Sequence, residues 1–334
     1  MRKIGLFGAG HLGKIHLKLL NEIEEWDLVG FFDPNPEVAA TVAEKFGIPG
    51  FESAEALLSQ VDAVDIVTPT LSHFDIAKSA LKAGKHVFIE KPLSHTLAEG
   101  QALLEIQAEH PELVIQVGHV ERFNPAFLSV EDREIQPRFI EGHRLAPYNP
   151  RGTDVSVVLD LMIHDLDIVL SLVRSPIKEI NASGVSVISD TPDIANARIE
   201  FVNGCVANLT ASRISIKQMR RLRFFQKNNY LALDFLKKES EVFSLEEEVD
   251  PSKGDSQMAM PLETGKETKF LVFEKPESRG VNAIKMELEE FARSVQQGEP
   301  VKVSLQDGYN ALEAAHMILA RIDENAAETI DPRA

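Results

Sequence analysis

Residues 3–13 read KIGLFGAGHLG, a short apolar run that passes directly into a glycine-rich turn. The apolar run predicts a β-strand, and the amphipathic sequence after the turn, residues 12–24, predicts a helix. In such a unit Gly8 permits a tight bend, Gly10 lets a ligand approach the backbone, and Gly13 lets helix and strand pack closely. The N–H groups at the start of the helix are then available to an anion. The stretch predicts a site for the pyrophosphate of a dinucleotide.

Asp33 ends the next apolar run, residues 28–32, at the separation of about 20 residues that a ribose-binding acid has in such folds. A carboxylate there accepts hydrogen bonds from an adenosine ribose and repels a 2′-phosphate, so the sequence favours NAD over NADP. Asp33 also fits as a cap for a helix over residues 37–46, because Asp-Pro-Asn-Pro is a turn sequence. The two roles can coexist.

Composition and charge limit the possible partners. The chain has 334 residues, enough for two domains, and 44% of them are apolar. Its formal net charge of −17 argues against binding to nucleic acid or to an anionic membrane surface. A phosphate-bearing ligand must therefore be bound by local donors.

Cys205 is the only cysteine, which excludes an intrachain disulfide and fits a reducing, cytoplasmic compartment. No apolar run approaches the ~18 residues of a membrane helix, so we expect no membrane span. We also expect no metal site, because no His, Asp and Glu residues have coherent ligand spacing beyond Asp160 and His164.

The first third of the chain alternates short apolar runs with helical patterns. This is typical of an α/β domain with a doubly wound parallel sheet, which we place at residues 1–120, and ligands bind such a sheet at the carboxyl ends of its strands. The expected strands are 3–7, 28–32, 64–68, 86–89 and 113–117, and the expected helices are 12–24, 37–46, 53–58, 72–83 and 97–110.

After about residue 118 one helical pattern is followed by β-rich runs with short turns, which predicts an α+β domain with a mostly antiparallel sheet over residues 121–334. We expect residues 246–266 to form an exposed loop, and the last helix to pack back on the first domain. If one face of this sheet is uncovered, that face should pack against another copy of the chain, so we expect a homo-oligomer, either dimer or tetramer. The expected strands are 177–188, 194–201, 205–212, 220–226 and 230–235, and the expected helices are 156–172, 282–296 and 305–325.

Two groups of residues are candidates for catalysis. Lys91 follows a predicted strand, where such a sheet presents side chains to its ligand, although an exposed loop lysine is the simpler alternative. Asp160 and His164 are four residues apart on one helix face, so the carboxylate can orient the imidazole and favour its protonation. The alternative is a surface pair, with Asp165 and Asp167 on a solvated face. The residues alone do not decide between these interpretations.

Taken together, the motifs resemble those of the glucose–fructose oxidoreductase/inositol dehydrogenase/MocA (Gfo/Idh/MocA) family. The resemblance covers essentially the whole chain. It implies a Rossmann domain, an open-faced α+β domain, a nicotinamide cofactor, and a dehydrogenase that acts on the CH–OH group of a sugar or polyol. The motifs that carry it are GAGHLG at 8–13, TPT at 68–70 with His73, FIEKPL at 88–93, the Asp160–His164 pair and residues 300–308.

The family's lysine, aspartate and histidine correspond to Lys91, Asp160 and His164. The resemblance implies that His164 removes the hydroxyl proton, Lys91 stabilises the alkoxide, and Asp160 orients His164, or that Lys91 and His164 exchange roles. The residues expected at the cofactor are Gly8, Gly10, His11, Leu12, Gly13, Asp33, Thr68, Pro69, His73, Glu90 and Lys91. Those expected at the substrate are Lys91, His119, Arg122, Asn124, Asp160 and His164.

Two of these residues have simpler roles available. His73 fits as an ordinary histidine in the first turn of a helix, and Asn124 fits as a helix cap that precedes a proline. A trio of basic residues has no assigned ligand, and we expect it to protect an edge strand. The trio is Arg220, Arg221 and Arg223.

The segments GHVERFNPA at 118–126 and VVLDLMIHDLD at 157–167 are most similar to the nucleotide-sugar branch of the family, the UDP-N-acetylglucosamine 3-dehydrogenase-like proteins. The phosphates of a UDP-sugar would then be bound by Arg122, Arg144 and Arg151, whereas a free sugar or inositol needs mainly neutral partners. A different class stays open, namely a dinucleotide-dependent sensor or regulatory protein without turnover.

Overall fold

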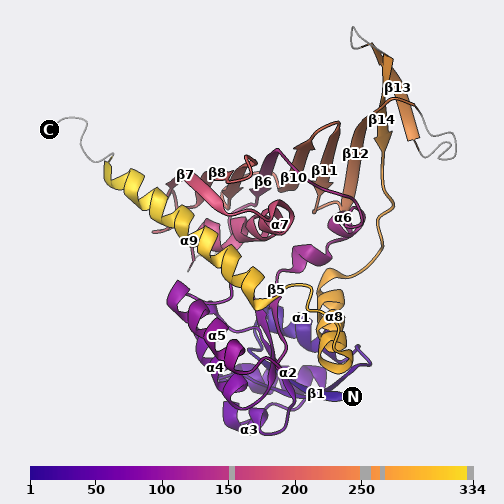
Figure 1. The fold of residues 1–334 in the computed structure, drawn as a ribbon. Helices are drawn as coiled ribbons and strands as arrows, with labels where there is room; N and C mark the ends of the chain where they lie inside the picture. Colours follow the sequence, from indigo (N-terminus) through magenta and orange to yellow (C-terminus); the bar gives the residue numbers. More distant parts are fainter. Residues whose placement is uncertain (150–154, 249–256, 264–267, 329–334) are drawn as a thin grey trace. The chain divides into compact units, whose positions relative to one another are not determined.

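The computed structural model describes residues 1–149, 155–248, 257–263 and 268–328 (Figure 1). The chain divides into two compact units, Met1–Phe123 with Val281–Glu313, and Asn124–Gly280 with Ala314–Ala334. The predicted boundary near residue 120 lies close to the first of these limits. Residues 281–313 belong to the first unit rather than to the second domain, and within that unit the N–H of Val117 donates to the carbonyl oxygen of Val303 at 3.1 Å.

The first unit contains a five-stranded parallel sheet in the order β2-β1-β3-β4-β5. The crossovers change direction at β1, so the carboxyl ends of β1 and β3 flank the position where such sheets bind ligands. The strands are β1 Arg2–Phe7, β2 Trp26–Phe32, β3 Ala63–Ile66, β4 His86–Glu90 and β5 Ile115–Gly118. The helices are α1 His11–Leu20, α2 Pro36–Phe46, α3 Ala54–Leu58, α4 His73–Lys82, α5 Leu97–Glu109 and α8 Ala283–Gln297, with short 3₁₀ turns η1 Thr70–Ser72 and η2 Val120–Phe123.

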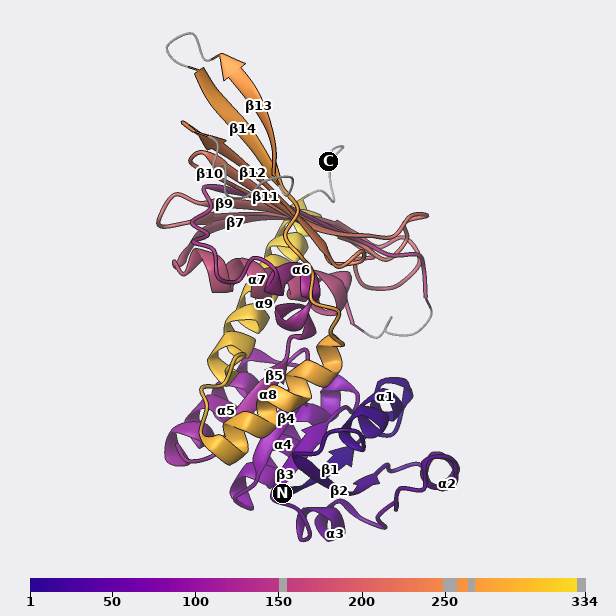
Figure 2. The same cartoon turned by 90° about the vertical axis from the view of Figure 1, so that its right-hand side faces the viewer.

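Helices cover both faces of this sheet (Figure 2). Strand side chains alternate between two apolar clusters: Phe88 packs with α1 and α8, and its neighbours Val87 and Ile89 pack with α4 and α5. Helix ends follow local chemistry, as in α2, where the Asn35 side chain accepts hydrogen bonds from two N–H groups and Gly47 ends the helix at φ 66°. The cap of α2 is thus Asn35, which leaves Asp33 for another role.

Among its described residues, the second unit is built on a nine-stranded sheet in the order β13-β14-β12-β11-β10-β6-β9-β8-β7. Its pairs are antiparallel except β6 with β9, so the expected mostly antiparallel sheet is confirmed. The strands are β6 Phe139–Leu145, β7 Ile177–Val185, β8 Ile194–Phe201, β9 Val206–Ser212, β10 Met219–Gln226, β11 Asn229–Asp234, β12 Glu239–Glu246, β13 Gln257–Glu263 and β14 Thr268–Glu274.

One face of this sheet packs against helices, and the β13–β14 hairpin extends beyond the other strands (Figure 1). The helices are α6 Pro125–Leu128 and α7 Ile163–Val173, the latter preceded by a π-helical turn, η3 Val158–Met162. The last helix, α9 Leu305–Glu328, begins in the first unit and ends in the second, where Arg321 donates to the carbonyl of Ile180 on β7.

Two sequence predictions about this sheet are wrong. Residues 246–266 include strand β13, which was missed because the acidic, Gly-, Ser- and Pro-containing composition of the segment suggests a loop. Its Pro261 is tolerated in a strand because β13 lies at the edge of the sheet. Arg220, Arg221 and Arg223 do not protect an edge, because β10 lies between β6 and β11. Arg221 instead lies 3.7 Å from Asp234, and Arg223 pairs with Glu141, both across neighbouring strands.

Within the described ranges, none of the helices combines the length and the apolar character that a bilayer span requires.

Candidate active site

The glycine turn has the shape that a pyrophosphate site requires. Gly8 has φ 92°, and a Cβ on Gly13 would lie 1.9 Å from the carbonyl oxygen of Gly8, so both positions require glycine. A Cβ on Gly10 would meet no atom within 4 Å, which leaves open space over the turn. Gly10 also stands at the N-terminus of α1, where no side chain caps the helix. The turn therefore offers free N–H groups and room for an anion.

Asp33 is tied to this turn. Its Oδ2 accepts a hydrogen bond from the N–H of Ala9 at 2.8 Å, and its Oδ1 accepts one from Asn35 at 2.9 Å. The carboxylate is thereby held at the end of β2 beside the glycine turn. Because each carboxylate oxygen has two lone pairs, acceptor capacity remains for the hydroxyls of a ribose.

A second loop borders the glycine turn. A Cβ on Gly8 would lie 2.9 Å from Thr68, and the Thr68 hydroxyl is buried without a hydrogen-bond partner among the described residues. Behind it the two ring nitrogens of His73 lie 2.9 Å from the carbonyl oxygens of Thr68 and Pro92. His73 therefore holds the loop after β3 against the loop after β4, and its own contact with a cofactor stays a prediction.

Lys91 follows the last residue of β4 and is half-buried. Its N–H donates to Oε2 of Glu90 at 3.1 Å. The preceding residue, Glu90, is only 7% exposed and lies opposite Gly118 in the register of β4 with β5. The backbone at Lys91 is thus fixed by the side chain of its neighbour.

The structure also shows a buried acid–base group that sequence patterns do not reveal, because its members come from four elements. His16 Nδ1 lies 2.9 Å from Asp65 Oδ2, and His16 Nε2 lies 3.3 Å from Glu90 Oε1. Ligand atoms of His16, Glu90 and Glu287 lie within 4.8 Å of one another. The only sequence signal was the presence of polar residues inside otherwise apolar strand and helix patterns.

The pKa values of the four buried side chains are shifted in different directions. Burial acts to lower the pKa of His16, but the carboxylates of Asp65 and Glu90 together raise it well above its usual value. Burial, reinforced by the nearby Glu90 carboxylate, raises the pKa of Glu287 well above its usual value. Burial acts to raise the pKa of Glu90, but His16 and Lys91 outweigh it and keep this pKa below its usual value. For Asp65 burial raises the pKa, and His16 offsets part of the rise.

In the second unit, Asp160 lies in the π-helical turn η3 and His164 in the first turn of α7, and both are half-buried. The expected single helix over 156–172 is therefore two helical types in succession. Four residues is close to one turn in either type, so the two side chains still point to one side. A π-turn inside a helix often accompanies a functional site.

The alternative of a solvated face on α7 is wrong. Asp165 and Asp167 are 2% and 1% exposed, and Asp165 accepts hydrogen bonds at 3.1 and 2.7 Å from the guanidinium of Arg144 on β6. Arg144 is itself 2% exposed. Its expected role as a phosphate ligand is therefore wrong, because a buried Asp165 already neutralises it. Arg151 lies outside the described residues.

The segment after β5 has several roles in packing. Asn124 is the N-cap of α6, with its Oδ1 accepting from Ala126 and its Nδ2 donating to the carbonyl of Phe235. The cap interpretation of Asn124 is thus confirmed. Arg122 lies 4.0 Å from Asp307 and is 9% exposed, and His119 is buried. Substrate contacts by these residues stay predictions.

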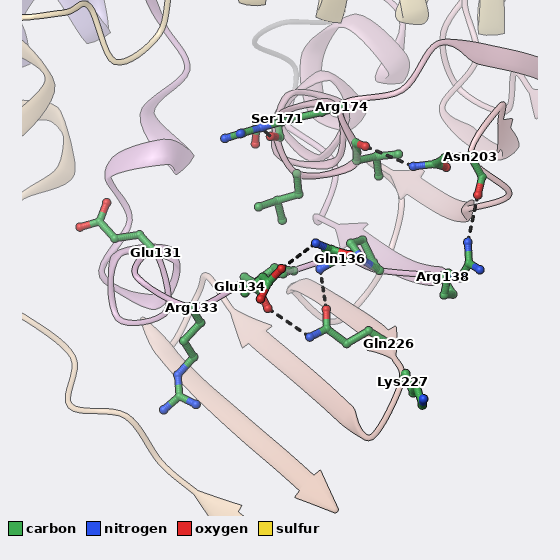
Figure 3. A pocket seen from close by; sticks show the side chains of 14 residues that line it. Glu131, Arg133, Glu134, Gln136, Arg138, Ser171, Arg174, Asn203, Gln226 and Lys227 are labelled. Carbon is green, nitrogen blue, oxygen red and sulfur yellow. Dashed lines mark hydrogen bonds between the residues drawn. The ribbon is translucent and has the colours of Figure 1, made fainter.

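A surface pocket of about 910 Å³ lies elsewhere in the second unit (Figure 3). It is lined by residues before β6, by the β10–β11 turn and by the C-terminal end of α7, whereas His164 lies at the other end of that helix. Its polar groups are largely bonded to one another, as with Arg138 and the carbonyl of Asn203 at 3.0 Å. The pocket includes none of the predicted site residues.

A parallel sheet that carries a dinucleotide turn is typical of nucleotide-dependent oxidoreductases. Comparison with known proteins agrees with this class. Residues 2–119 match the oxidoreductase family with an NAD-binding Rossmann fold, and residues 136–228 match the GFO/IDH/MocA C-terminal domain. The chain belongs to the Gfo/Idh/MocA oxidoreductase family, as its motifs suggested. It is accordingly an enzyme that transfers a hydride to or from a nicotinamide cofactor.

Individual relatives agree with this assignment. The chain is 42% identical over 235 residues to UDP-N-acetylglucosamine 3-dehydrogenase of Acidithiobacillus ferrooxidans, covering 70% of this chain and 74% of the relative. The solved structure of that enzyme superposes with a TM-score of 0.85 at 34% identity, over 97% of this chain and 98% of the other. The NAD⁺-dependent scyllo-inositol 2-dehydrogenase of Bacillus subtilis is 32% identical over 234 residues, covering 64% of this chain and 68% of the relative.

Proposed function

We propose that this protein oxidises a secondary hydroxyl of a UDP-linked N-acetylated amino sugar, with NAD as hydride acceptor. The observation that supports this most is the likeness to UDP-N-acetylglucosamine 3-dehydrogenase, in sequence over 70% of the chain and in fold over 97% of it. Asp33, held beside the glycine turn, supports NAD rather than NADP because a 2′-phosphate would meet its negative charge.

The proposed chemistry uses Lys91, Asp160 and His164. The bound dinucleotide would supply the hydride acceptor. Lys91 donates a hydrogen bond to the substrate hydroxyl and stabilises the negative charge that develops on its oxygen. His164 accepts the hydroxyl proton, and Asp160 orients the imidazole and compensates its charge. The reverse division, in which Lys91 takes the proton, uses the same residues.

The remaining parts of the site follow from these roles. The glycine turn at residues 8–13 binds the pyrophosphate through Gly8, Gly10, His11, Leu12 and Gly13. Thr68 and Pro69 line the same cofactor site. Arg122 is the candidate for a substrate phosphate, although it would have to share its charge with Asp307. We further propose that the enzyme works as a homo-oligomer in the cytoplasm.

A substrate panel tests the proposal. NADH formation is followed with UDP-N-acetylglucosamine, N-acetylglucosamine, glucose, scyllo-inositol and myo-inositol as alternatives. We expect turnover with the UDP-sugar and at least about a hundredfold lower kcat/KM for the free sugars, because binding energy from the nucleotide is lost. Turnover of an inositol without turnover of the UDP-sugar contradicts the substrate assignment. Tight NADH binding without turnover of any compound favours the alternative, a dinucleotide-dependent sensor or regulatory protein.

The catalytic roles are tested by Lys91→Ala and His164→Ala. We expect each variant to bind NADH with an unchanged Kd and to lose about a thousandfold in kcat, because each removes a group that acts in the proton-transfer step. Lys82→Ala, an exposed lysine at the end of α4, serves as the control and should keep full activity. Full activity in both catalytic-site variants would remove the proposed centre.

A further inference from the structure

Four acid–base side chains meet inside the first unit beneath the end of β4, and the proposed reaction uses none of them directly. His16 comes from α1, Asp65 from β3, Glu90 from β4 and Glu287 from α8. His16, Asp65 and Glu287 have no exposed surface. The surroundings are apolar, with the ring of Phe88 6.0 Å from that of His16. Charged groups persist in such a place only when they neutralise one another.

The two carboxylates beside His16 favour an imidazolium. Nδ1 lies 2.9 Å from a carboxylate oxygen of Asp65 and Nε2 lies 3.3 Å from one of Glu90. A neutral imidazole has one N–H and one lone pair, so it can donate to only one of the two carboxylates. With a proton on each nitrogen, the ring donates to Asp65 through Nδ1, presents the N–H of Nε2 to Glu90 at ion-pair distance, and balances one of the two carboxylate charges.

Glu287 has the opposite requirement. Both of its carboxylate oxygens are buried without a hydrogen-bond partner within the described part of the chain. Its position is fixed by the backbone of α8, because Gln116 donates to the carbonyl of Glu287 at 2.8 Å and Trp26 donates to that of Leu288 at 3.2 Å. A third carboxylate charge here would repel Glu90. An uncharged carboxylic acid would instead offer Glu90 a hydrogen-bond donor.

Glu90 is the member that connects this group to the reaction. Its carboxylate accepts from the N–H of Lys91 and packs on Gly118, where a Cβ would lie 3.0 Å from the carboxylate carbon. We infer that His16, as an imidazolium bound to Asp65 and Glu90, and Glu287, as a carboxylic acid, are positioning residues that hold Glu90 and through it Lys91. The role of Lys91 rests on the proposed function.

The charges sum to neutrality in this arrangement. Asp65 and Glu90 are negative, His16 and Lys91 are positive, and Glu287 is uncharged. Among the described residues, Glu121 on η2 and His73 on α4 also interact electrostatically with the cluster. A divalent cation held by His16, Glu90 and Glu287 is the alternative. It would need the lone pair of His16 Nε2, which the imidazolium does not have, so the two states are experimentally distinct.

The protonation state is tested without any substrate. Nitrogen NMR of the full-length protein with labelled histidine, with the His16 resonances assigned by their loss in His16→Gln, reports whether each ring nitrogen carries a proton. We expect both to be protonated between about pH 6 and 8, where an ordinary histidine titrates. A neutral ring at His16 in this range overturns the inference. This readout is independent of the proposed function, because it needs no turnover.

The positioning role is tested by Glu287→Gln and Glu287→Leu in the same enzyme. The amide of glutamine is uncharged and can still donate, so we expect kcat within about threefold of wild type, whereas leucine should lower kcat by about tenfold to a hundredfold with little change in KM. Gly118→Ala, which displaces the Glu90 carboxylate, should lower kcat as much as Glu287→Leu does. Glu289→Gln, a half-buried acid of the same helix, should have no effect.

Two results contradict the positioning role. If Glu287→Gln is as impaired as Glu287→Leu, and elemental analysis finds a bound divalent metal in the wild-type enzyme only, the cluster is a metal site. If Glu287→Leu and Gly118→Ala both fold and keep full kcat, the cluster does not position Lys91. A failure of the substrate panel alone would leave the NMR result standing and would reject only the proposed function.

Discussion

At the scale of single residues, the dinucleotide turn shows why three glycines in one motif are not equivalent. Gly13 is required by packing, since a Cβ there would lie 1.9 Å from the carbonyl oxygen of Gly8. Gly10 is free of such contacts, because a Cβ at that position would have no atom within 4 Å. One glycine therefore serves the fold, and the other leaves space for a ligand.

This difference predicts opposite outcomes for two alanine variants. Gly13→Ala should lower the free energy of unfolding by about 3 kcal/mol, because the new methyl group overpacks the turn. Gly10→Ala should leave the unfolding curve unchanged and weaken NADH binding by about tenfold or more, because its methyl group occupies the space over the turn. Denaturant unfolding and calorimetric titration measure the two effects. Equal loss of stability in both variants would contradict the assignment.

Asp33 carries the prediction about cofactor choice. Asp33→Ala removes the negative charge and the ribose acceptor, so we expect the Kd for NADH to rise about tenfold and the Kd for NADPH to fall. Asp27→Ala, an exposed acid on the same strand, is the control and should change neither. Tighter NADPH than NADH binding in the wild-type enzyme would show that the carboxylate does not select the cofactor.

At the scale of elements, β6 and α7 are joined by a buried ion pair, Arg144 with Asp165. The guanidinium also lies 5.8 Å from the ring of Phe235 on the turn after β11. Because His164 lies in the first turn of α7, this pair helps to fix the helix that carries the proposed base. The sequence could not reveal this role, because alternation of charged residues along a helix is also the pattern of a solvated face.

Removing one member of the pair should cost more than removing both. Arg144→Met removes the guanidinium that donates to the buried Asp165 carboxylate, so we expect a loss of about 3–5 kcal/mol in the free energy of unfolding. The double variant Arg144→Met/Asp165→Leu should recover most of this loss. Urea unfolding of the single and double variants completes the cycle, and additive losses would argue that the two side chains act independently.

The same scale shows how far sequence patterns predict this fold. The strands and helices of the first unit follow their expected ranges closely, because each apolar run ends at a glycine, a proline or a capping residue such as Asn35 or Thr96. Strand β6 was missed because alternating Glu141 and His143 resemble a polar connection. The pairing of Arg144 with Asp165 and the cluster around His16 depend on contacts between distant segments, which no local pattern encodes.

At the scale of the whole molecule, the open face of the second sheet is the feature that bears on assembly. Five aromatic side chains lie side by side across neighbouring strands on the face away from α6 and α7, with ring centroids 4.8–5.7 Å apart. Such a continuous aromatic row is costly to leave in water. The residues are Phe139, Phe225, Tyr230, Phe243 and Phe273.

We therefore predict that the aromatic row is buried between copies of the chain. Light scattering should give a mass of at least a dimer for the wild-type protein, and Phe243→Glu should shift it toward the monomer by placing a charge in the contact. Val202→Glu, at an exposed turn, should leave the mass unchanged. A monodisperse wild-type monomer at all protein concentrations would contradict the predicted assembly.

In the proposed mechanism, Lys91 and His164 act on one hydroxyl of a nucleotide sugar next to the nicotinamide. The most direct measurement is a crystal structure of the enzyme with NAD and UDP-N-acetylglucosamine. We expect the Lys91 ammonium and a ring nitrogen of His164 within about 3 Å of the same sugar oxygen. The claim is contradicted if the ammonium points away from the sugar, or if the imidazole contacts no substrate oxygen.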